Sequence, residues 1–329
     1  MDLIQHRFAA MGGQNEIQLY VQVDAQGRQA CLAAAAEVLR IEQKYSRYRP
    51  DSVISLINAA AGLAPVLLDA ETSALLAYCD ACFNASDGLF DVTSGVLRGA
   101  WDFSVQNDQL DAAPRRVPPT AELSVLLDRV GWRKVMRQDQ RLALPAGMAL
   151  DFGGIGKEYA ADRACAVLLS AGVRHGLVDL GGDIRVLGPQ PTPGTRWSDG
   201  QALDTQPWLV GIAHPRRAGQ TLCTVAMDHG ALATSGDYER YFEMDGRRYC
   251  HILNPLTGMP CEYWQSVSVI APVCMAAGSA CTIAMLKGVQ GTAFLNAQQV
   301  DYLAINNLLQ QSGGRFQRQA GTNGAYALN

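Results

Sequence analysis

The stretch 150–158, with the sequence LDFGGIGKE, joins an apolar segment to a glycine-rich turn and then to a helical pattern that continues to Arg163. A strand, a turn and a helix in this order leave main-chain N–H groups free at the start of the helix, where they stabilise an anion. Lys157 adds a positive charge beside them. The glycine spacing is that of neither a P-loop nor a dinucleotide-binding fingerprint. The stretch predicts an anion site, or a turn whose glycines only let helix and strand pack closely.

A second glycine turn lies in the stretch 178–185, VDLGGDIR, and carries Asp183 and Arg185 on a predicted strand. Its two glycines clear space for a ligand or for another segment of backbone. The acidic and basic side chains form either a structural ion pair or contacts to a ligand.

Two later segments carry side chains suited to chemistry. His251 leads into an Asn-Pro turn framed by proline and glycine, and a histidine on such a loop can accept a proton near neutral pH. Lone histidines are more often structural, but this chain has only five. The stretch 273–288 is a helical run of small residues, on which Ser279 and Thr282 share a face. Such helices usually serve as packing surfaces.

The pattern along the rest of the chain predicts an α+β fold. Residues 14–23 alternate apolar and polar side chains, as a half-buried strand does. Helices are expected over residues 29–45 and 72–86, and strands near 134–137 and 142–150. Strands and helices alternate irregularly, which favours α+β over a regular α/β arrangement.

The domain organisation predicted is one large domain over residues 1–329 with two sublobes, because no repeat or domain linker divides the chain. The proline-containing stretches 104–119 and 188–206 are expected to be surface connections. The tail 313–329 is rich in Gly and Gln and is expected to be partly frayed.

Composition and charge exclude several classes of protein. Hydrophobic residues make up 48% and charged residues 18% of the chain, so a sizeable core is expected. A net charge of −4 gives no case for a nucleic-acid surface. No apolar run reaches the roughly 18 residues of a membrane span, and the N-terminus lacks a signal-peptide pattern, so we expect a cytoplasmic protein. Nine cysteines without framework spacing fit a reducing compartment, and the Cys79 and Cys82 pair fits core packing better than zinc or redox chemistry.

Taken in order, five blocks of this sequence resemble the ApbE family of FAD:protein FMN transferases. The resemblance runs from about Phe8 to Gly288. The blocks are residues 8–12 (FAAMG), residues 45–58 (YSRYRPDSVISLIN), residues 90–93 (FDVT), the glycine turn from Asp151, and residues 235–260. The small-residue helix ending at Thr282 extends the match.

The resemblance implies a fold related to the T-fold, with an FAD cleft between the sublobes. It implies a Mg²⁺-dependent reaction in which FMN passes from FAD to a Ser or Thr of an acceptor protein and AMP leaves. His251 takes the place of the catalytic base, and Lys157 lies where it would stabilise the pyrophosphate. The resemblance, with the second glycine turn, places FAD contacts at Met11, Tyr48, Phe90, Asp91, Asp151, Lys157, Asp183, Ser235 and Ile252.

Three positions depart from the family pattern. The family holds its metal through a helix Asp, a Thr four residues later and a carbonyl of the glycine turn. Thr282 and Gly154 match the last two, but the Asp position is Gly278. A water could replace the missing carboxylate, or Ser279 could supply a weaker ligand. Asn254 stands where the family has Asp, and Glu158 stands where it has Gly.

These departures leave alternatives to an active transferase. The chain could bind or carry FAD without transferring FMN, or it could hydrolyse FAD to FMN and AMP with water as the acceptor. An NAD(P)-dependent oxidoreductase is disfavoured, because no Gly-x-Gly-x-x-Gly opens a βαβ unit. The motifs support FAD binding better than catalysis. They leave open the identity of the acceptor protein and the oligomeric state.

Overall fold

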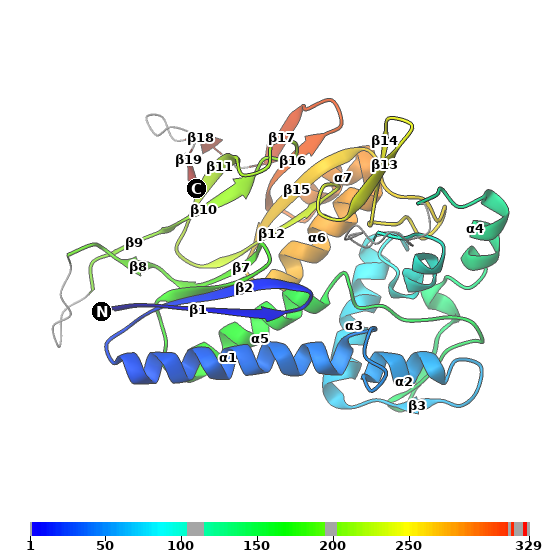
Figure 1. The fold of residues 1–329 in the computed structure, drawn as a ribbon, viewed down its shortest axis with the longest axis horizontal. Helices are drawn as coiled ribbons and strands as arrows, with labels where there is room; N and C mark the ends of the chain where they lie inside the picture. The colour runs from blue at the N-terminus through cyan, green and yellow to red at the C-terminus, as the bar shows by residue number, and fades with distance from the viewer. Residues whose placement is uncertain (1, 104–114, 195–202, 315–316, 319–324, 328–329) are drawn as a thin grey trace, which may run out of the picture.

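The computed structural model describes residues 2–103, 115–194, 203–314, 317–318 and 325–327. Within these ranges, an antiparallel sheet of eight strands forms the centre of the molecule (Figure 1). In spatial order its strands are β1 (Asp2–Ala10), β2 (Gly13–Val21), β6 (Gly176–Leu180), β7 (Asp183–Gly188), β12 (Gly230–Gly236), β15 (Trp264–Ala271), β16 (Asp301–Asn306) and β17 (Gln311–Gly314).

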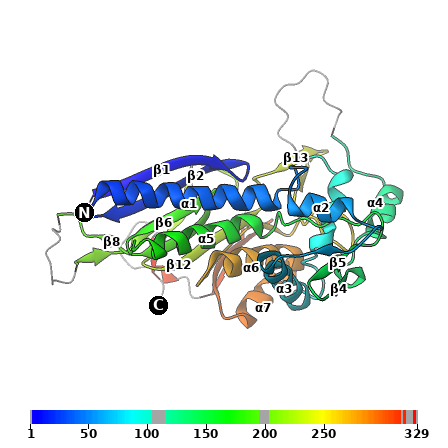
Figure 2. The same cartoon turned by 90° about the horizontal axis from the view of Figure 1, so that it is seen from below.

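Three helices cover one face of this sheet. α1 (Asp24–Tyr45) lies against β1 and β2, α5 (Gly156–Ser170) against β6 and β7, and α6 (Cys274–Lys287) against β12 and β15. Figure 2 looks onto this layer, with α1 and α5 side by side. The buried residues of α1 recur at helical spacing and are Gly27, Ala30, Cys31, Ala34, Ala35, Val38, Ile41 and Tyr45. These small side chains let α1 pack closely on the sheet and on α5.

A smaller sheet covers the opposite face. Its described strands, in spatial order, are β10 (Trp208–Ala213), β11 (Thr221–Met227), β19 (Ala325–Ala327) and β18 (Gln317–Arg318). Val210 and Val225 of the small sheet share a buried cluster with Val186 and Leu232 of the large one. The middle strands β6, β7, β12, β15 and β16 are therefore buried on both faces, whereas alternate residues of the edge strand β1 are exposed. Burial of apolar surface is the main term that stabilises this three-layer arrangement.

The remaining elements are short, apart from α3. Those between α1 and α5 are α2 (Val53–Ala59), β3 (Val66–Leu67), α3 (Ala70–Ala85), η1 (Val92–Gly99), α4 (Thr120–Leu127), η2 (Trp132–Lys134), β4 (Met136–Gln138) and β5 (Arg141–Ala143). Those after β7 are β8 (Gln190–Pro191), β9 (Thr205–Gln206), β13 (Tyr241–Met244), β14 (Arg247–Cys250), η3 (Gly288–Gln290) and α7 (Gly291–Ala297).

A cluster of aromatic side chains joins η1 to the β13–β14 hairpin. Five ring pairs among Trp101, Phe103, Phe242 and Tyr249 have centroid distances of 5.2 to 6.2 Å. Trp101 also donates its indole N–H to the carbonyl of Gly258 at 2.8 Å. These contacts hold the loop that follows β14 against η1, and that loop carries His251.

The predicted α+β fold is confirmed, and β2, α1 and α3 lie within a few residues of their predicted ranges. The predicted strand 142–150 is wrong beyond Ala143, where β5 ends. The side chain of Asn58 takes the place of a neighbouring strand, because it accepts from the N–H of Leu150 at 2.7 Å and donates to its carbonyl at 3.0 Å. Asp151 then donates its N–H to Val92.

The predicted fraying of the tail 313–329 does not extend to its described residues. Residues 313–314 belong to β17, which pairs with β16, and β19 pairs with β11, so the main-chain groups there have partners. The rest of the tail, like residues 104–114 and 195–202 of the two predicted connections, lies outside the described residues.

No helix in the described ranges combines the length and apolar character needed to cross a bilayer. The nine cysteines are free thiols. Cys79 and Cys82 lie on α3 and are buried in the core cluster, which confirms the predicted packing role.

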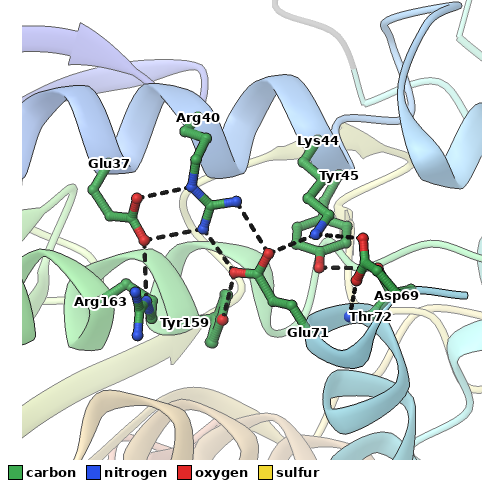
Figure 3. A network of polar contacts seen from close by, with 9 residues as sticks. All are labelled: Glu37, Arg40, Lys44, Tyr45, Asp69, Glu71, Thr72, Tyr159 and Arg163. Atoms are coloured by element: carbon green, nitrogen blue, oxygen red, sulfur yellow. Dashed lines mark hydrogen bonds and ion pairs between the residues drawn. The ribbon is translucent and has the colours of Figure 1, made fainter.

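A network of ion pairs ties α1, α3 and α5 together (Figure 3). Glu71 of α3 lies at its centre and accepts from Arg40 at 2.7 Å, Lys44 at 2.6 Å and the hydroxyl of Tyr159 at 2.7 Å. The hydrogen bond from Arg40 is the largest cause that holds the pKa of Glu71 well below its usual value, and Lys44 and Tyr159 add to it against the opposing effect of burial. Because Tyr159 belongs to the first turn of α5, the network fixes the helix that follows the glycine turn.

Candidate functional site

A cavity opens where the glycine turn, α5, α6 and the loop after β14 meet. It contains about 1000 Å³ of empty space, part of it open to solvent. Most of the residues predicted from sequence line it, namely Phe90, Asp91, Asp151, Gly154, Lys157, Asp183, Ser235, His251, Ile252 and Thr282. These residues come from segments far apart in the chain, so the fold assembles one site from the separate sequence blocks.

The glycine turn places its main chain along the cavity wall. Gly154 lies against the ring of Phe90, so close that a Cβ at this position would be 3.5 Å from the ring edge. Ile155 and Gly156 donate their N–H groups to the carbonyl of Phe152. Those two N–H groups are therefore not free for an anion, and side chains supply most of the positive charge that faces the cavity.

Asp151 acts as a clamp for two arginines. Its carboxylate lies 2.9 Å from a guanidinium nitrogen of Arg47 and 2.9 Å from Nε of Arg98, and it also accepts the N–H of Gly153. Gly95 allows this approach, since a Cβ there would lie 2.6 Å from the Cβ of Asp151. Arg98 lines the cavity and was not predicted from sequence, because no local pattern distinguishes it from other surface arginines. Asp151 therefore orients a cation toward the site.

Lys157 and Asp183 form an ion pair at 3.1 Å on the cavity wall. Burial opposes the charge of Lys157, but the carboxylates of Asp183, Glu158 and Glu239 outweigh it and raise the pKa of the lysine. Burial raises the pKa of Asp183, while Lys157 lowers it. Asp183 therefore forms an ion pair with Lys157, and both residues line the cavity, where a ligand can also reach them.

Glu158 is buried in the same wall, with 7% of its surface exposed. Burial, and then the charge of Asp183, raise the pKa of its carboxyl group. Its Oε2 atom is buried and has no hydrogen-bond partner in the described structure. A carboxylate oxygen left in this state is costly unless a ligand satisfies it.

The carboxylate of Asp91 accepts hydrogen bonds from other residues of the protein. Oδ1 accepts from the N–H of Thr93 at 2.8 Å and from its hydroxyl at 2.6 Å, and Oδ2 accepts from the N–H of Trp132 at 2.9 Å. Asp91 therefore holds the start of η1 and the loop before η2, although it borders the cavity. Its neighbour Phe90 presents an apolar ring to the site.

His251 has the geometry of a proton acceptor. Its Nδ1 lies 3.3 Å from the carbonyl oxygen of Arg240, so Nδ1 carries the proton and Nε2 is the acceptor. Burial, followed by the charges of Arg98 and Arg240, lowers the pKa of His251 to about 4. The ring is therefore neutral at physiological pH. It remains partly accessible from the cavity.

The loop after His251 is shaped by Asn254. Its side-chain oxygen accepts from the N–H of Leu256 at 2.8 Å, and its main chain bonds Gly258 and Met259. Ile252 accepts from the N–H of Cys261 and is buried on the cavity wall. An amide oxygen performs this turn function as well as a carboxylate would, so Asn254 needs no negative charge.

On α6, only one of the two predicted hydroxyl ligands faces the site. Thr282 lines the cavity, and its hydroxyl lies 3.2 Å from that of Ser235. Ser279 does not line it. The hydroxyl of Ser279 lies 2.7 Å from that of Tyr78 and donates to the carbonyl of Met275 at 2.7 Å. The structure therefore does not bring Ser279, a predicted metal ligand, to the cavity wall that Thr282 lines, because its hydroxyl is bonded to Tyr78 and Met275.

Met11 and Tyr48 lie outside the cavity wall. Met11 forms the β1–β2 turn and donates its N–H to Glu42 at 2.7 Å. The ring of Tyr48 is 75% exposed and lies 5.1 Å from the guanidinium of Arg47, which in turn contacts Asp151. Tyr48 thus stands next to Arg47, the partner of the cavity residue Asp151, and its exposed ring is available for stacking.

The described residues contain no group of three or more His, Cys, Asp or Glu side chains arranged to hold a metal ion. Any cation in this cavity would therefore need hydroxyl or main-chain oxygen ligands beside at most two such side chains, and Mg²⁺ accepts these oxygens. Thr282 carries a hydroxyl and Gly154 a main-chain carbonyl, and both residues line the cavity.

Comparison with known proteins agrees with this geometry. The FAD:protein FMN transferase of Treponema pallidum is 33% identical over 279 residues, covering 80% of this chain and 74% of that protein. The FAD:protein FMN transferase of Vibrio cholerae is 30% identical over 272 residues, covering 80% of this chain and 75% of that protein. The crystal structure of the ApbE protein of Thermotoga maritima matches with a TM-score of 0.83 at 30% identity, covering 97% of this chain and all of that one (100%).

A model of the ApbE family matches residues 11–304, which is most of the chain. The match includes the glycine turn, His251 and Thr282. This chain belongs to the ApbE family.

Proposed function

We propose that this chain transfers FMN from FAD to a Ser or Thr hydroxyl of an acceptor protein, with Mg²⁺ bound and AMP as the leaving group. One observation carries the proposal: a neutral histidine and two cationic side chains, Lys157 and Arg98, face one cavity in a member of a family whose curated relatives are named FAD:protein FMN transferases. The cavity is open to solvent on one side, so a ligand longer than its enclosed part can extend from it.

The walls of the cavity suit the two ends of FAD. Phe90, Ile252 and Leu286 give an apolar surface for a ring system. Lys157 and Arg98 supply charge for the pyrophosphate, and both are held by buried or half-buried carboxylates. Tyr48, next to Arg47 outside the wall, offers a ring for stacking. This arrangement lets the phosphates lie between the glycine turn and His251.

The transfer breaks the phosphoanhydride bond of FAD and forms a phosphoester bond to the acceptor. The acceptor hydroxyl oxygen forms a bond to the phosphorus of the FMN half, and the bond from that phosphorus to the oxygen of AMP breaks. Nε2 of His251 takes the hydroxyl proton. Lys157 and Arg98 stabilise the charge that develops on the phosphate oxygens. In this scheme water is a poor substitute for the acceptor, because productive geometry depends on how the acceptor protein presents its hydroxyl.

The residues present also fit a divalent cation. Thr282 and the Gly154 carbonyl offer oxygen ligands. Glu158 lines the same cavity, and its Oε2 atom has no hydrogen-bond partner, so this oxygen is available to a cation. Mg²⁺, when bound, would offset negative charge on the pyrophosphate. Ser279 is not proposed as a ligand, because its hydroxyl is bonded to Tyr78 and Met275.

The test is an incubation of the full chain with FAD, Mg²⁺ and a candidate acceptor protein. AMP is measured by chromatography and flavin on the acceptor by mass spectrometry. Transfer predicts AMP and covalent FMN in equal amounts, both lost with EDTA. Equal amounts of AMP and free FMN without any acceptor would instead identify a hydrolase, and FAD binding without AMP would identify a flavin carrier.

A further inference from the structure

The carboxylate of Glu158 fills the space next to Gly278. A Cβ built at Gly278 would lie 2.5 Å from Cγ and 2.5 Å from Oε1 of Glu158, and 2.9 Å from Cδ. No side chain can occupy position 278 without displacing Glu158, since real Cβ contacts are never this short. The carboxylate group of Glu158 therefore lies where the side chain of residue 278 would begin.

The packing of α5 on α6 fixes this approach. Asp162, one turn after Glu158 on α5, accepts the N–H groups of Cys274 and Met275 at 2.9 Å each, at the first turn of α6. Gly278 lies one turn after Cys274. Asp162 of α5 therefore contacts the first turn of α6. One turn away on each helix, Glu158 of α5 faces Gly278 of α6.

The same turn of α6 leads to the cavity. Gly278 and Thr282 are four residues apart on one face of the helix, and Thr282 and Glu158 both line the cavity. Oε2 of Glu158 is buried without a hydrogen-bond partner, while Lys157 is already paired with Asp183 at 3.1 Å. Two buried carboxyl groups share one lysine, so a cation bound at Oε2 of Glu158 would supply the partner that this oxygen lacks.

We propose that Glu158 supplies the carboxylate ligand of the divalent cation in this chain, together with Thr282 and the carbonyl of Gly154, and that Gly278 is glycine to make room for it. The ligand comes from α5 instead of α6. The two departures from the family pattern then compensate for each other, because Glu158 supplies the carboxylate that Gly278 lacks. This inference rests on the proposed function for its metal, but it concerns cation binding and can be measured without turnover.

The experiment measures Mn²⁺ binding to the full chain by electron paramagnetic resonance, with Mg²⁺ as competitor. Glu158→Gln keeps the shape of the side chain and removes its charge. We expect it to weaken Mn²⁺ binding by at least about 10-fold, the loss typical of even an outer-shell partner of a metal. Glu239→Gln is the matched control, because Glu239 lines the same cavity without contacting Gly278. Glu239→Gln should change the Mn²⁺ affinity less than about 5-fold, because the lost charge would act on the ion only through a screened electrostatic interaction.

A second pair of variants tests the exchange itself. Glu158→Gly should bind Mn²⁺ as weakly as Glu158→Gln, and Glu158→Gly combined with Gly278→Asp should regain most of the lost affinity. Thermal melting of each variant checks that it is folded. Equal Mn²⁺ affinity of Glu158→Gln and the wild type would overturn the proposal, and so would a double variant that stays as weak as Glu158→Gly.

The two proposals fail in different ways. If AMP and flavinylated acceptor form in a Mg²⁺-dependent reaction while Glu158→Gln binds Mn²⁺ like the wild type, the ligand assignment is wrong and the function stands. If Glu158→Gln loses Mn²⁺ but the wild type forms no AMP from FAD, the ligand assignment stands and the function is wrong.

Discussion

The Nδ1 atom of His251 lies 3.3 Å from the carbonyl oxygen of Arg240, which leaves Nε2 as the only acceptor on the ring. If Nε2 takes the proton of the acceptor hydroxyl, His251→Ala should lower kcat for FMN transfer by about 10²- to 10⁴-fold. FAD affinity should change little, because the proton moves only during the reaction. AMP release and FAD fluorescence quenching measure the two effects.

His229→Ala is the control for this variant, since His229 is exposed at the turn between β11 and β12 and does not line the cavity. It should retain wild-type rates. A loss of FAD affinity in His251→Ala as large as the loss of rate would assign His251 to binding instead of proton transfer.

The pH dependence of transfer follows from the same residue. Burial and the nearby charges of Arg98, Arg240 and Lys157 lower the pKa of His251 to about 4. The base works only when unprotonated, so its active fraction is complete at neutral pH and declines as the pH falls toward about 4. We expect kcat/KM to be flat between about pH 8 and pH 6. An inflection near pH 6.5, the ordinary histidine value, would contradict this prediction.

Lys157 is predicted to serve both stability and FAD binding. Lys157→Met leaves Asp183 buried without its partner and should lower the free energy of unfolding by about 3 kcal/mol. It should also weaken FAD binding by about 10- to 100-fold, through the loss of a charged contact to phosphate. Lys157→Met combined with Asp183→Asn should recover stability but not FAD affinity, as measured by denaturant unfolding and flavin fluorescence. Recovery of both would show that Lys157 acts only through Asp183.

Asn254 is predicted to act by shaping its turn. Asn254→Asp keeps an oxygen for the N–H of Leu256, so unfolding free energy and transfer rate should remain close to wild type. Asn254→Ala removes that acceptor and should cost about 1 kcal/mol. Urea unfolding and AMP release measure these outcomes. A large gain of activity in Asn254→Asp would mean that a negative charge is needed at this position.

The network around Glu71 predicts how stability changes in acid. The hydrogen bonds from Arg40, Lys44 and Tyr159 place the folded-state pKa of Glu71 below its unfolded value, so its contribution is complete above about pH 4.3 and is lost as the pH falls below that. Glu71→Gln should lower stability at pH 7 by about 1 to 2 kcal/mol, after allowance for solvent screening. Its stability should also decline less steeply between pH 5 and pH 3 than that of the wild type.

Glu122→Gln is the matched control for this network, because Glu122 also accepts two hydrogen bonds from one arginine, Arg116, but at the surface. Glu122→Gln should leave the melting temperature nearly unchanged at pH 7 and between pH 5 and pH 3. Equal effects of Glu71→Gln and Glu122→Gln would contradict the structural role given to the α1–α3–α5 network.

The sequence by itself determined the features that depend on local pattern. Period-two alternation located β2, helical spacing located α1 and α3, and the glycine turn before Lys157 correctly preceded a helix. The ordered blocks identified the family, and they named most of the residues that line the cavity. Each of these signals is carried by residues close together in the chain, or by their order along it.

Only the tertiary structure decided which side chains meet. Asn58 satisfies the main chain of Leu150 from a distant helix, and so ends a strand that the apolar pattern alone would extend. Ser279 turns to Tyr78 and away from the cavity, and Glu158 reaches the space that Gly278 leaves open. Such contacts depend on how two helices cross and on the depth at which each side chain is buried. The order of residues along one chain segment does not specify these quantities, because packing against other segments sets them.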